Sequence, residues 1–338
     1  MYWNIYSNFG NIYSNFDLEK RNYYMFGQRQ QTIEQTISGS GVGLHSGRHS
    51  KVSLSPAPVD NGIVFRRKVN SHVETCQASI RNLRSTELCT VLGSNGFQIQ
   101  TTEHVLSALW GLGIDNAFID IDSEEVPAMD GSAAPFAKLI RLAGILPQER
   151  PKTYLKIVEP IHIGDGNRGI SILPALFPKI TYTIDYDHEL IQQQTYEHEW
   201  STVDFEANIA HARTFAFSHE VEALWARGLG QGGSLDNTIV FSDTGIMNEE
   251  ALRFPDECVR HKVLDLIGDL SLLGIHVIGH IVAKCSGHQL HTQLVQAILD
   301  NPEAWTLIGP PEKHVSELAD LIGKDDIHAV PVPANAAF

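Results

Sequence analysis

Three residues of the stretch RHKVLDLIGDLSLLG (260–274) combine reactive side chains with helical spacing. His261, Asp265 and Asp269 stand at i, i+4 and i+8, so a helix places them on one face. Apolar residues recur around them at helical spacing, which predicts a helix that is at least half buried. An imidazole and a carboxylate four residues apart can bind one metal ion, as the paired ligands of metalloprotease helices do. The alternative is a His–Asp ion pair on a solvated helix face.

A second pair of candidate residues lies in TTEHVLSALWG (101–111). Glu103 and His104 are adjacent at the start of a predicted helix, with Thr101 or Thr102 as its N-cap. A histidine can bind zinc while a neighbouring carboxylate takes a proton from water on the metal. The alternatives are an acid that the helix dipole favours in the first turn and a histidine with a local hydrogen bond.

A third group lies in SGHQLHTQ (286–293), where Gly287 precedes His288 at the start of a predicted helix. A histidine that faces a metal-bound water can act as a general acid or stabilise an oxyanion. Asp269 could orient this histidine, as carboxylates often do. We expect the nearby His291 to be a surface residue.

Together these groups suffice for metal-assisted hydrolysis of an amide or an ester. Two histidines and one aspartate make a three-ligand zinc site whose fourth position is left for water. In this hypothesis the ligands are His104, His261 and Asp265, while Glu103 supplies a base and His288 an acid. The fold must then bring these residues together.

Two glycine-rich stretches bear on substrate binding. GVGLHSGR (41–48) has three glycines around His45 and ends in Arg48, so its backbone N–H groups could hold a phosphate. A tight hairpin explains the same glycines equally well. GLGQGGSLDNTIV (228–240) lacks the GK[ST] ending of a P-loop and no strong helix follows it, which excludes hydrolysis of a nucleoside triphosphate by such a loop.

The composition limits the class of protein. The 338 residues carry 25 basic and 40 acidic side chains, a formal net charge of −15, which argues against a nucleic-acid-binding protein. No apolar stretch is long enough for a membrane span, and the start of the chain lacks the pattern of a secretory signal. None of the four cysteines forms a CxxC pair, which predicts reduced thiols in a cytoplasm. They are Cys76, Cys89, Cys258 and Cys285.

Strand and helix patterns alternate along the chain, and the candidate catalytic and metal-binding residues lie on the predicted helices or at their starts. The first half predicts strands within 31–58, 62–69 and 116–123, and helices at 101–111 and after Asp130 or Ser132. The second half predicts strands near 153–164, 168–174 and 179–186, irregular and helical sequence over 200–250, a long helix after Pro255, a strand at 276–286 and a helix at about 287–299. Each half thus runs strands, helix, strand, helix, which predicts a layered α+β protein of two similar domains.

The expected domain boundaries follow from the same patterns. We expect a disordered N-terminal extension at 1–24, where NIYSNF occurs twice, then a first α+β domain at 25–149 and a second at 150–300. The polar, proline-containing stretch PQERPK (147–152) is the predicted linker. Residues 301–338 form a C-terminal segment.

The chain resembles the UDP-3-O-acyl-N-acetylglucosamine deacetylases, zinc amidases of lipid A synthesis. The matching stretches occur in the family's order from about residue 28 to 300. They are GVGLHSG (41–47), GIVFRR (62–67), TTEHVLSALWGLGIDN (101–116), VPAMDGSAAPF (126–136), ARTF (212–215), GLGQGGSLDNTIV (228–240), RFPDECVRHKVLDLIGDLSLLG (253–274) and SGHQL (286–290).

The resemblance implies two α+β domains whose helices are sandwiched between two β-sheets, with the active site at the domain junction. It also implies a role for each matching residue. The zinc ligands would be His104, His261 and Asp265, the general base Glu103, and the catalytic histidine His288 with Asp269 as its orienting carboxylate. Thr214 would help to hold the carbonyl oxygen, Lys262 and His45 would contact the nucleotide side of the substrate, and Phe215 would begin an apolar passage at 215–240 for the acyl chain.

The implied reaction removes the N-acetyl group of UDP-3-O-[(3R)-3-hydroxyacyl]-N-acetylglucosamine and yields acetate, the committed step of lipid A (lipopolysaccharide) biosynthesis in Gram-negative bacteria. Either Glu103 or His288 would protonate the leaving amine. The cofactor would be Zn²⁺, with Fe²⁺ a reasonable competitor at His₂Asp ligands. We expect a cytoplasmic monomer whose partner is the acylated UDP-sugar. The alternatives are a zinc amidohydrolase for another acylated sugar or peptide, and a non-catalytic sugar-nucleotide binder that would tolerate loss of Glu103 or His288.

Overall fold

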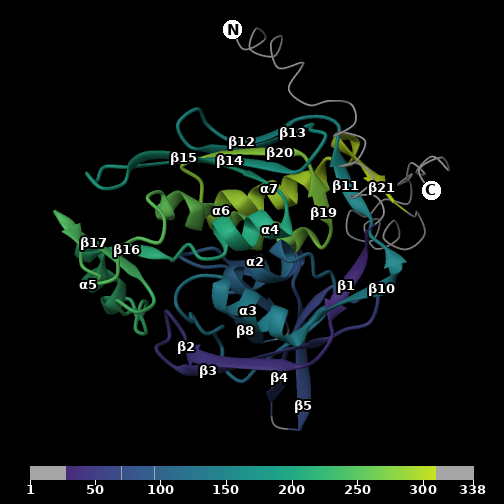
Figure 1. Ribbon diagram of the computed structural model, residues 1–338, viewed down its shortest axis with the longest axis horizontal. Coiled ribbons are helices and arrows are strands. Elements are labelled where there is room, and N and C mark those ends of the chain that lie inside the picture. The colour runs from purple at the N-terminus through teal and green to yellow at the C-terminus, as the bar shows by residue number, and fades with distance from the viewer. Residues whose placement is uncertain (1–27, 70, 95, 310–338) are drawn as a thin grey trace, which may run out of the picture.

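Two five-stranded sheets enclose a layer of helices in the computed structural model (Figure 1). The structure describes residues 28–309 apart from residues 70 and 95. The predicted α+β fold, with helices sandwiched between two sheets, is confirmed. The expected N-terminal extension at 1–24 and all of the C-terminal segment beyond residue 309 lie outside the described residues.

The first large sheet has the strand order β2-β3-β9-β4-β5. These strands are β2 (Ile37–Val42), β3 (His49–Pro56), β9 (Ala117–Ile121), β4 (Ile63–Val69) and β5 (His72–Gln77). The pair β4–β9 is parallel and the other pairs are antiparallel. Along β9 the residues alternate between buried and half-buried, as the sequence predicts for a strand with one face on the core.

The second large sheet repeats this arrangement in the order β12-β13-β20-β14-β15. Its strands are β12 (Ile161–Gly164), β13 (Gly169–Leu173), β20 (His280–Lys284), β14 (Lys179–Tyr186) and β15 (Gln192–Glu199). Again one parallel pair, β14–β20, lies among antiparallel pairs. The two halves of the chain therefore share one topology.

The helix layer holds α2 (Glu103–Gly111) and α3 (Ala134–Ala143) from the first half and α6 (Glu257–Leu270) and α7 (His288–Asp300) from the second (Figure 1). All of α2 and most of α6 are buried, because these helices are covered on both sides. Thr102 precedes α2 as expected, but its hydroxyl donates to the carbonyl oxygen of Thr90 (3.0 Å) and does not cap the helix.

Four smaller sheets complete the described fold. Three are β1 (Arg29–Ile33) with β10 (Ile145–Pro151); β19 (His276–Ile278), β11 (Tyr154–Ile157) and β21 (Trp305–Ile308); and β6 (Leu83–Ser85), β7 (Val91–Ser94) and β8 (Phe97–Ile99). The fourth joins β16 (Phe215–Phe217), β17 (Ile239–Ser242) and β18 (Gly245–Ile246), and α5 (Ser218–Ala226) lies beside it (Figure 1).

The structure differs from the sequence prediction at three places. Most of the expected linker belongs to β10, which pairs with β1 in a two-stranded sheet where prolines are tolerated. The strand expected at 276–286 is two strands, because the chain passes from one sheet to another at Gly279, where a Cβ atom would stand 2.9 Å from Ile172. The stretch 200–250 also contains the β16–β18 sheet, and the polar edge strand β15 was not predicted.

Two further findings concern the predicted class of protein. In the described part of the chain no helix combines the length and the apolar character that a bilayer span requires. Each of the four cysteines is a free thiol.

Candidate active site

The buried faces of α2 and α6 bring two histidines and an aspartate together. Nε2 of His261 lies 3.3 Å from Oδ1 of Asp265, and Nε2 of His104 lies 3.7 Å from the same oxygen. The rings of His104 and His261 meet edge to face with their centroids 5.1 Å apart. His261 and Asp265 each expose only 2 % of their surface and His104 exposes 3 %, which excludes the alternative of a solvated surface ion pair.

The protonation states of this cluster suit a metal ion. Burial lowers the pKa of His261 to about 3, so its imidazole is neutral and keeps a lone pair. Burial alone would raise the pKa of Asp265, but the neighbouring His261 ring and the Lys262 ammonium hold it well below its usual range, so the carboxylate is ionised. Metal ligands must be deprotonated in this way. Nδ1 of His261 lies 3.1 Å from the carbonyl oxygen of Ala212, which leaves Nε2 for the cluster.

Within the described residues, three possible ligand atoms from His104, His261 and Asp265 lie within 4.8 Å of one another. The buried Nδ1 of His104 has no hydrogen-bond partner there. Two imidazoles and one carboxylate form a donor set that Zn²⁺ and Fe²⁺ both accept. The predicted ligand trio therefore fits a divalent metal ion.

Glu103 is the first residue of α2 and exposes only 3 % of its surface. The backbone N–H of Thr90 donates to Oε2 of Glu103 (3.0 Å) and fixes one carboxylate oxygen. Burial raises the pKa of Glu103, while the neighbouring His288 and His104 oppose this rise. A carboxyl group with a raised pKa beside a possible metal site has the properties of a general base.

His288 begins α7, as predicted, and its Nδ1 lies 2.8 Å from Oδ2 of Asp269 on α6. Burial alone would lower the pKa of His288, but the charge and hydrogen bond of Asp269 raise it to about 9. The imidazole is therefore protonated near neutral pH. Asp269 is wholly buried, and its Oδ1 accepts from the hydroxyl of Thr90 (2.5 Å).

The expectation that His291 lies on the surface is wrong. His291 exposes none of its surface, and its Nδ1 lies 2.8 Å from Oδ2 of Asp269. His288 and His291 are three residues apart on α7, so they share the helix face that packs against α6. Nε2 of His291 lies 3.0 Å from the hydroxyl of Tyr182 on β14.

A cavity of about 720 Å³ opens over the cluster. Its lining residues are Leu44, Ser85, Thr86, Glu87, Leu88, Glu103, His104, Arg168, Tyr186, Thr214, Phe215, His261, Lys262, Asp265, Ser286, Gly287, His288 and Gln289. Nζ of Lys262 lies 2.9 Å from Oδ2 of Asp265 and 5.5 Å from the ring centroid of Phe215. Burial opposes the charge of Lys262, but Asp265 raises its pKa, so the ammonium keeps its proton.

His45 is buried and is not among the residues that line this cavity, whereas its neighbour Leu44 is. The backbone N–H groups of His45 and Ser46 donate to the carboxylate of Glu125, at 2.8 and 2.7 Å. At Gly43 a Cβ atom would stand 2.3 Å from the same carboxylate, which explains the glycine there. Because Glu125 already occupies these donors, the structure favours the hairpin alternative over a phosphate-binding loop.

Nearly all of the predicted site residues meet around this cavity, since Asp269 lies directly behind His288. The sequence reasoning missed Thr90, which donates to both Glu103 and Asp269, and Arg168, which lines the cavity from the turn between β12 and β13. It also missed Tyr182. Thr90 and Tyr182 carry no local sequence signal, because their partners are distant in the chain.

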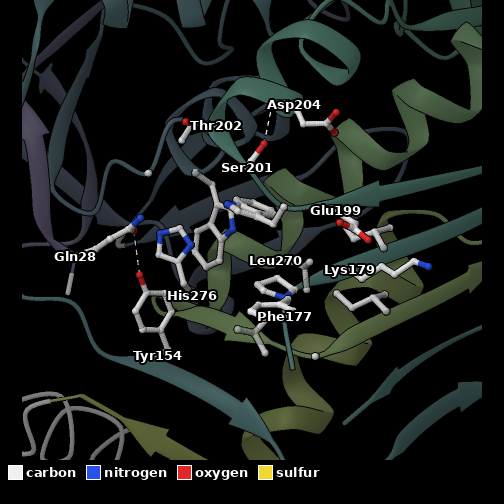
Figure 2. Close-up of a pocket in the computed structure, with 18 of the residues that line it drawn as sticks. Gln28, Tyr154, Phe177, Lys179, Glu199, Ser201, Thr202, Asp204, Leu270 and His276 are labelled. Carbon is white, nitrogen blue, oxygen red and sulfur yellow. Dashed lines mark hydrogen bonds between the residues drawn. The ribbon is translucent and has the colours of Figure 1, made fainter. Parts of the chain in front are cut away.

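A second cavity, of about 550 Å³, lies at the opposite end of α2, where Trp110 lines it. Figure 2 shows Gln28, Tyr154 and His276 among its lining residues. Trp110 and His276 meet there with their ring centroids 4.1 Å apart, and the hydroxyl of Tyr154 donates to Oε1 of Gln28 at 3.1 Å. Nζ of Lys152 lies 3.0 Å from Asp115. None of the predicted catalytic or metal-binding residues lines this cavity, so it is separate from the candidate active site.

The chain is similar to known proteins over most of its length. Residues 30–300 match the family model described as LpxC: UDP-3-O-acyl N-acetylglycosamine deacetylase. The UDP-3-O-acyl-N-acetylglucosamine deacetylase of Syntrophotalea carbinolica is 46 % identical over 279 residues, covering 82 % of this chain and 90 % of that protein. Proteins of the same name from Myxococcus xanthus and Pseudomonas entomophila are 44 % and 42 % identical, covering 82 % and 83 % of this chain and 89 % and 93 % of their own lengths.

Proposed function

The chain belongs to the UDP-3-O-acyl N-acetylglycosamine deacetylase family, and we propose that its buried His–His–Asp cluster is the metal site of that deacetylation. The enzyme hydrolyses the N-acetyl group of UDP-3-O-acyl-N-acetylglucosamine in lipid A biosynthesis. The observation that carries the proposed site is the convergence of three ligand atoms within 4.8 Å of one another in a cavity that also contains Glu103.

In this proposal His104, His261 and Asp265 bind Zn²⁺. When bound there, the metal supplies Lewis-acid polarisation of the acetyl carbonyl and makes water a better nucleophile. Fe²⁺ is a competitor for the same donors, since two imidazoles and a carboxylate suit both ions. The neutral imidazole of His261 and the ionised carboxylate of Asp265 support this assignment.

Glu103 acts as the general base in this proposal and takes a proton from the water that attacks the acetyl carbonyl carbon. Its carboxylate lines the cavity, and the Thr90 N–H holds one of its oxygens. His288, protonated at neutral pH and held by Asp269, donates its proton as the tetrahedral intermediate collapses to amine and acetate.

The remaining lining residues support a role in substrate binding. Thr214 offers a hydroxyl to the developing oxyanion. Lys262 and the exposed Arg168 place two cations at the cavity for the anionic diphosphate of the substrate, and His45 stays a proposed contact near the nucleotide. Phe215 begins the segment 215–240, which we assign to the acyl passage. The ring of Phe215 packs against Phe217 and Phe241, so this end of the segment is apolar.

The free thiols support a cytoplasmic location, and we propose that the enzyme acts as a monomer. The deciding experiment measures acetate release from UDP-3-O-(3-hydroxyacyl)-N-acetylglucosamine by protein whose metal content is known. The same assay on UDP-N-acetylglucosamine, which lacks the ester-linked chain, is the control.

Turnover of the acylated substrate together with little turnover of the control would support the proposal. Absence of acetate from fully metal-loaded protein would overturn the substrate assignment. Equal turnover of both substrates would instead favour a zinc amidohydrolase that does not use an acyl passage.

A further inference from the structure

Asp269 holds two imidazoles on one carboxylate oxygen. Oδ2 lies 2.8 Å from Nδ1 of His288 and 2.8 Å from Nδ1 of His291, and Oδ1 accepts from the hydroxyl of Thr90. The two rings stand nearly perpendicular, with their centroids 6.0 Å apart. His288 lines the cavity and His291 does not, so the hydrogen bond of His291 acts on the site through Asp269.

The protonation state of His291 follows from its burial and from its contact with Tyr182. Tyr182 is completely buried, and burial raises the pKa of its phenol well above the usual range, so the hydroxyl keeps its proton. This hydroxyl lies 3.0 Å from Nε2 of His291. Burial also lowers the pKa of His291, which favours the neutral ring. A neutral ring that donates to Asp269 from Nδ1 must accept from Tyr182 at Nε2.

The chain of contacts Tyr182–His291–Asp269–His288 therefore has one consistent direction. The Tyr182 hydroxyl donates to His291, and His291 donates to the carboxylate that orients the catalytic histidine. We propose that His291 is a positioning residue for the deacetylation, a neutral Nδ1–H donor that fixes Asp269 so that His288 is held toward the cavity. This inference rests on the proposed function and adds a residue to its site.

The same three side chains, Asp269, His288 and His291, could in principle hold a second metal ion, because their ligand atoms lie within 4.8 Å of one another. The contacts argue against that use. Both Nδ1 atoms already lie at hydrogen-bond distance from one carboxylate oxygen, and Nε2 of His291 faces a phenol. The cluster is therefore assigned to hydrogen bonding.

Two amide substitutions separate the two ends of the His291 ring. The amide nitrogen of His291→Asn can take the place of Nδ1 and donate to Asp269, whereas that of His291→Gln extends to the place of Nε2 and reaches Tyr182. His291→Leu removes both contacts. The matched control is His162→Gln, an exposed histidine of β12 whose Nδ1 lies 2.7 Å from the hydroxyl of Ser171.

The experiment measures kcat, KM and metal content for these four variants and for the wild type. We expect kcat to fall by about tenfold in His291→Gln and His291→Leu, with KM and metal content unchanged, as for loss of an orienting partner. His291→Asn should restore kcat to within about threefold of the wild type, and His162→Gln should match it. Equal losses in the Asn and Gln variants, or a wild-type kcat in His291→Gln, would overturn the proposal.

A second measurement does not depend on any variant. In wild-type protein labelled with ¹⁵N-histidine, the nitrogen shifts of His291 should identify a neutral ring with its proton on Nδ1. A proton on Nε2, or a charged ring at neutral pH, would overturn the proposal even if the variants fail to fold. Absence of acetate release from the wild type would instead refute the proposed function, while the tautomer of His291 would still be read.

Discussion

Gly268 of α6 lies directly against the backbone of Glu103 of α2. A Cβ atom at residue 268 would stand 2.1 Å from the carbonyl oxygen of Glu103 and 2.8 Å from its carbonyl carbon. Gly268 also separates Asp265 from Asp269 on the buried face of α6. The absence of a side chain at this one residue lets the two helices approach closely enough for Glu103 and His104 to meet His261 and Asp265.

Replacing Gly268 by alanine should therefore push the two helices apart, because the obstacle is backbone that cannot rotate away. We expect Gly268→Ala to lose about 1–3 kcal/mol of stability, the usual cost of overpacking, and to bind metal more weakly. Thermal unfolding and metal content measure both effects. Gly166→Ala is the control, since a Cβ atom there meets nothing within 4 Å. Wild-type metal content in Gly268→Ala would contradict this account.

Substitution of Glu103 should separate catalysis from metal binding. Glu103→Gln keeps the side chain's size and removes its ability to accept a proton, so we expect kcat to fall by about 10²–10⁴-fold. Metal content should stay at the wild-type level, because the three proposed ligands are other residues. His261→Ala is the comparison and should lose metal and activity together. Loss of metal from Glu103→Gln would show that the carboxylate is a ligand instead.

The activity should depend on pH through His288 and Glu103. His288 loses its proton as the pH rises through about 9, so kcat/KM should fall on that side if His288 is the acid. The charged groups that act on His288 include Asp269, Asp265 and Glu103. Glu103 gains a proton as the pH falls through its raised pKa, so activity should also fall on the acid side. In His288→Gln the fall of kcat/KM near pH 9 should disappear. If kcat/KM of this variant still fell there, another group would be responsible for the fall.

The raised pKa of His288 also predicts how the stability of the protein depends on pH. The pKa of His288 is raised by folding from 6.5 to about 9, so the folded state binds this proton more tightly than the unfolded state. Its contribution to stability is complete below 6.5 and is lost as the pH rises through about 9. The difference in unfolding free energy between wild type and His288→Gln should therefore shrink over that interval. Denaturant unfolding at several pH values measures it, and a constant difference would contradict the shift.

Sequence patterns predicted the parts of the site that depend on local spacing. His261 and Asp265 are one helical turn apart, and Glu103 and His104 begin a helix whose apolar pattern is clear, so their elements and faces follow from the sequence. Thr90 and Tyr182 could not be found this way, because their roles come from contacts across 179 and 109 residues of chain.

The errors have physical causes as well. His291 was expected on the surface because a histidine near a helix start is usually polar and exposed, but Asp269 and Tyr182 satisfy both of its ring nitrogens in the core. The stretch 147–152 was expected to be a linker because of its prolines. Pro147 and Pro151 instead lie in a two-stranded sheet, where a proline can occupy a position that does not donate a ladder bond.

A buried ion pair connects stability to the position of His261. The carboxylate of Glu257, which is wholly buried at the start of α6, accepts from the backbone N–H of Arg213 (3.0 Å) and from its Nε (2.9 Å). Ala212, the preceding residue, offers the carbonyl oxygen that faces Nδ1 of His261. The ion pair therefore anchors the segment that orients a proposed metal ligand.

Replacing Arg213 by methionine should leave the carboxylate of Glu257 buried without its cation, which costs about 3–5 kcal/mol when one partner of a buried pair is removed. We expect the midpoint of denaturant unfolding to fall sharply and the metal affinity to fall with it, because the segment that holds Ala212 keeps only the backbone N–H contact with Glu257 and loses the side-chain contacts. The control is Arg141→Met, which breaks the pair with Glu206, where the two side chains are 46 % and 32 % exposed, and should cost about 0–1 kcal/mol. If both variants lost the same stability, or if Arg213→Met kept the wild-type metal affinity, the Arg213–Glu257 pair would have no special part in holding His261.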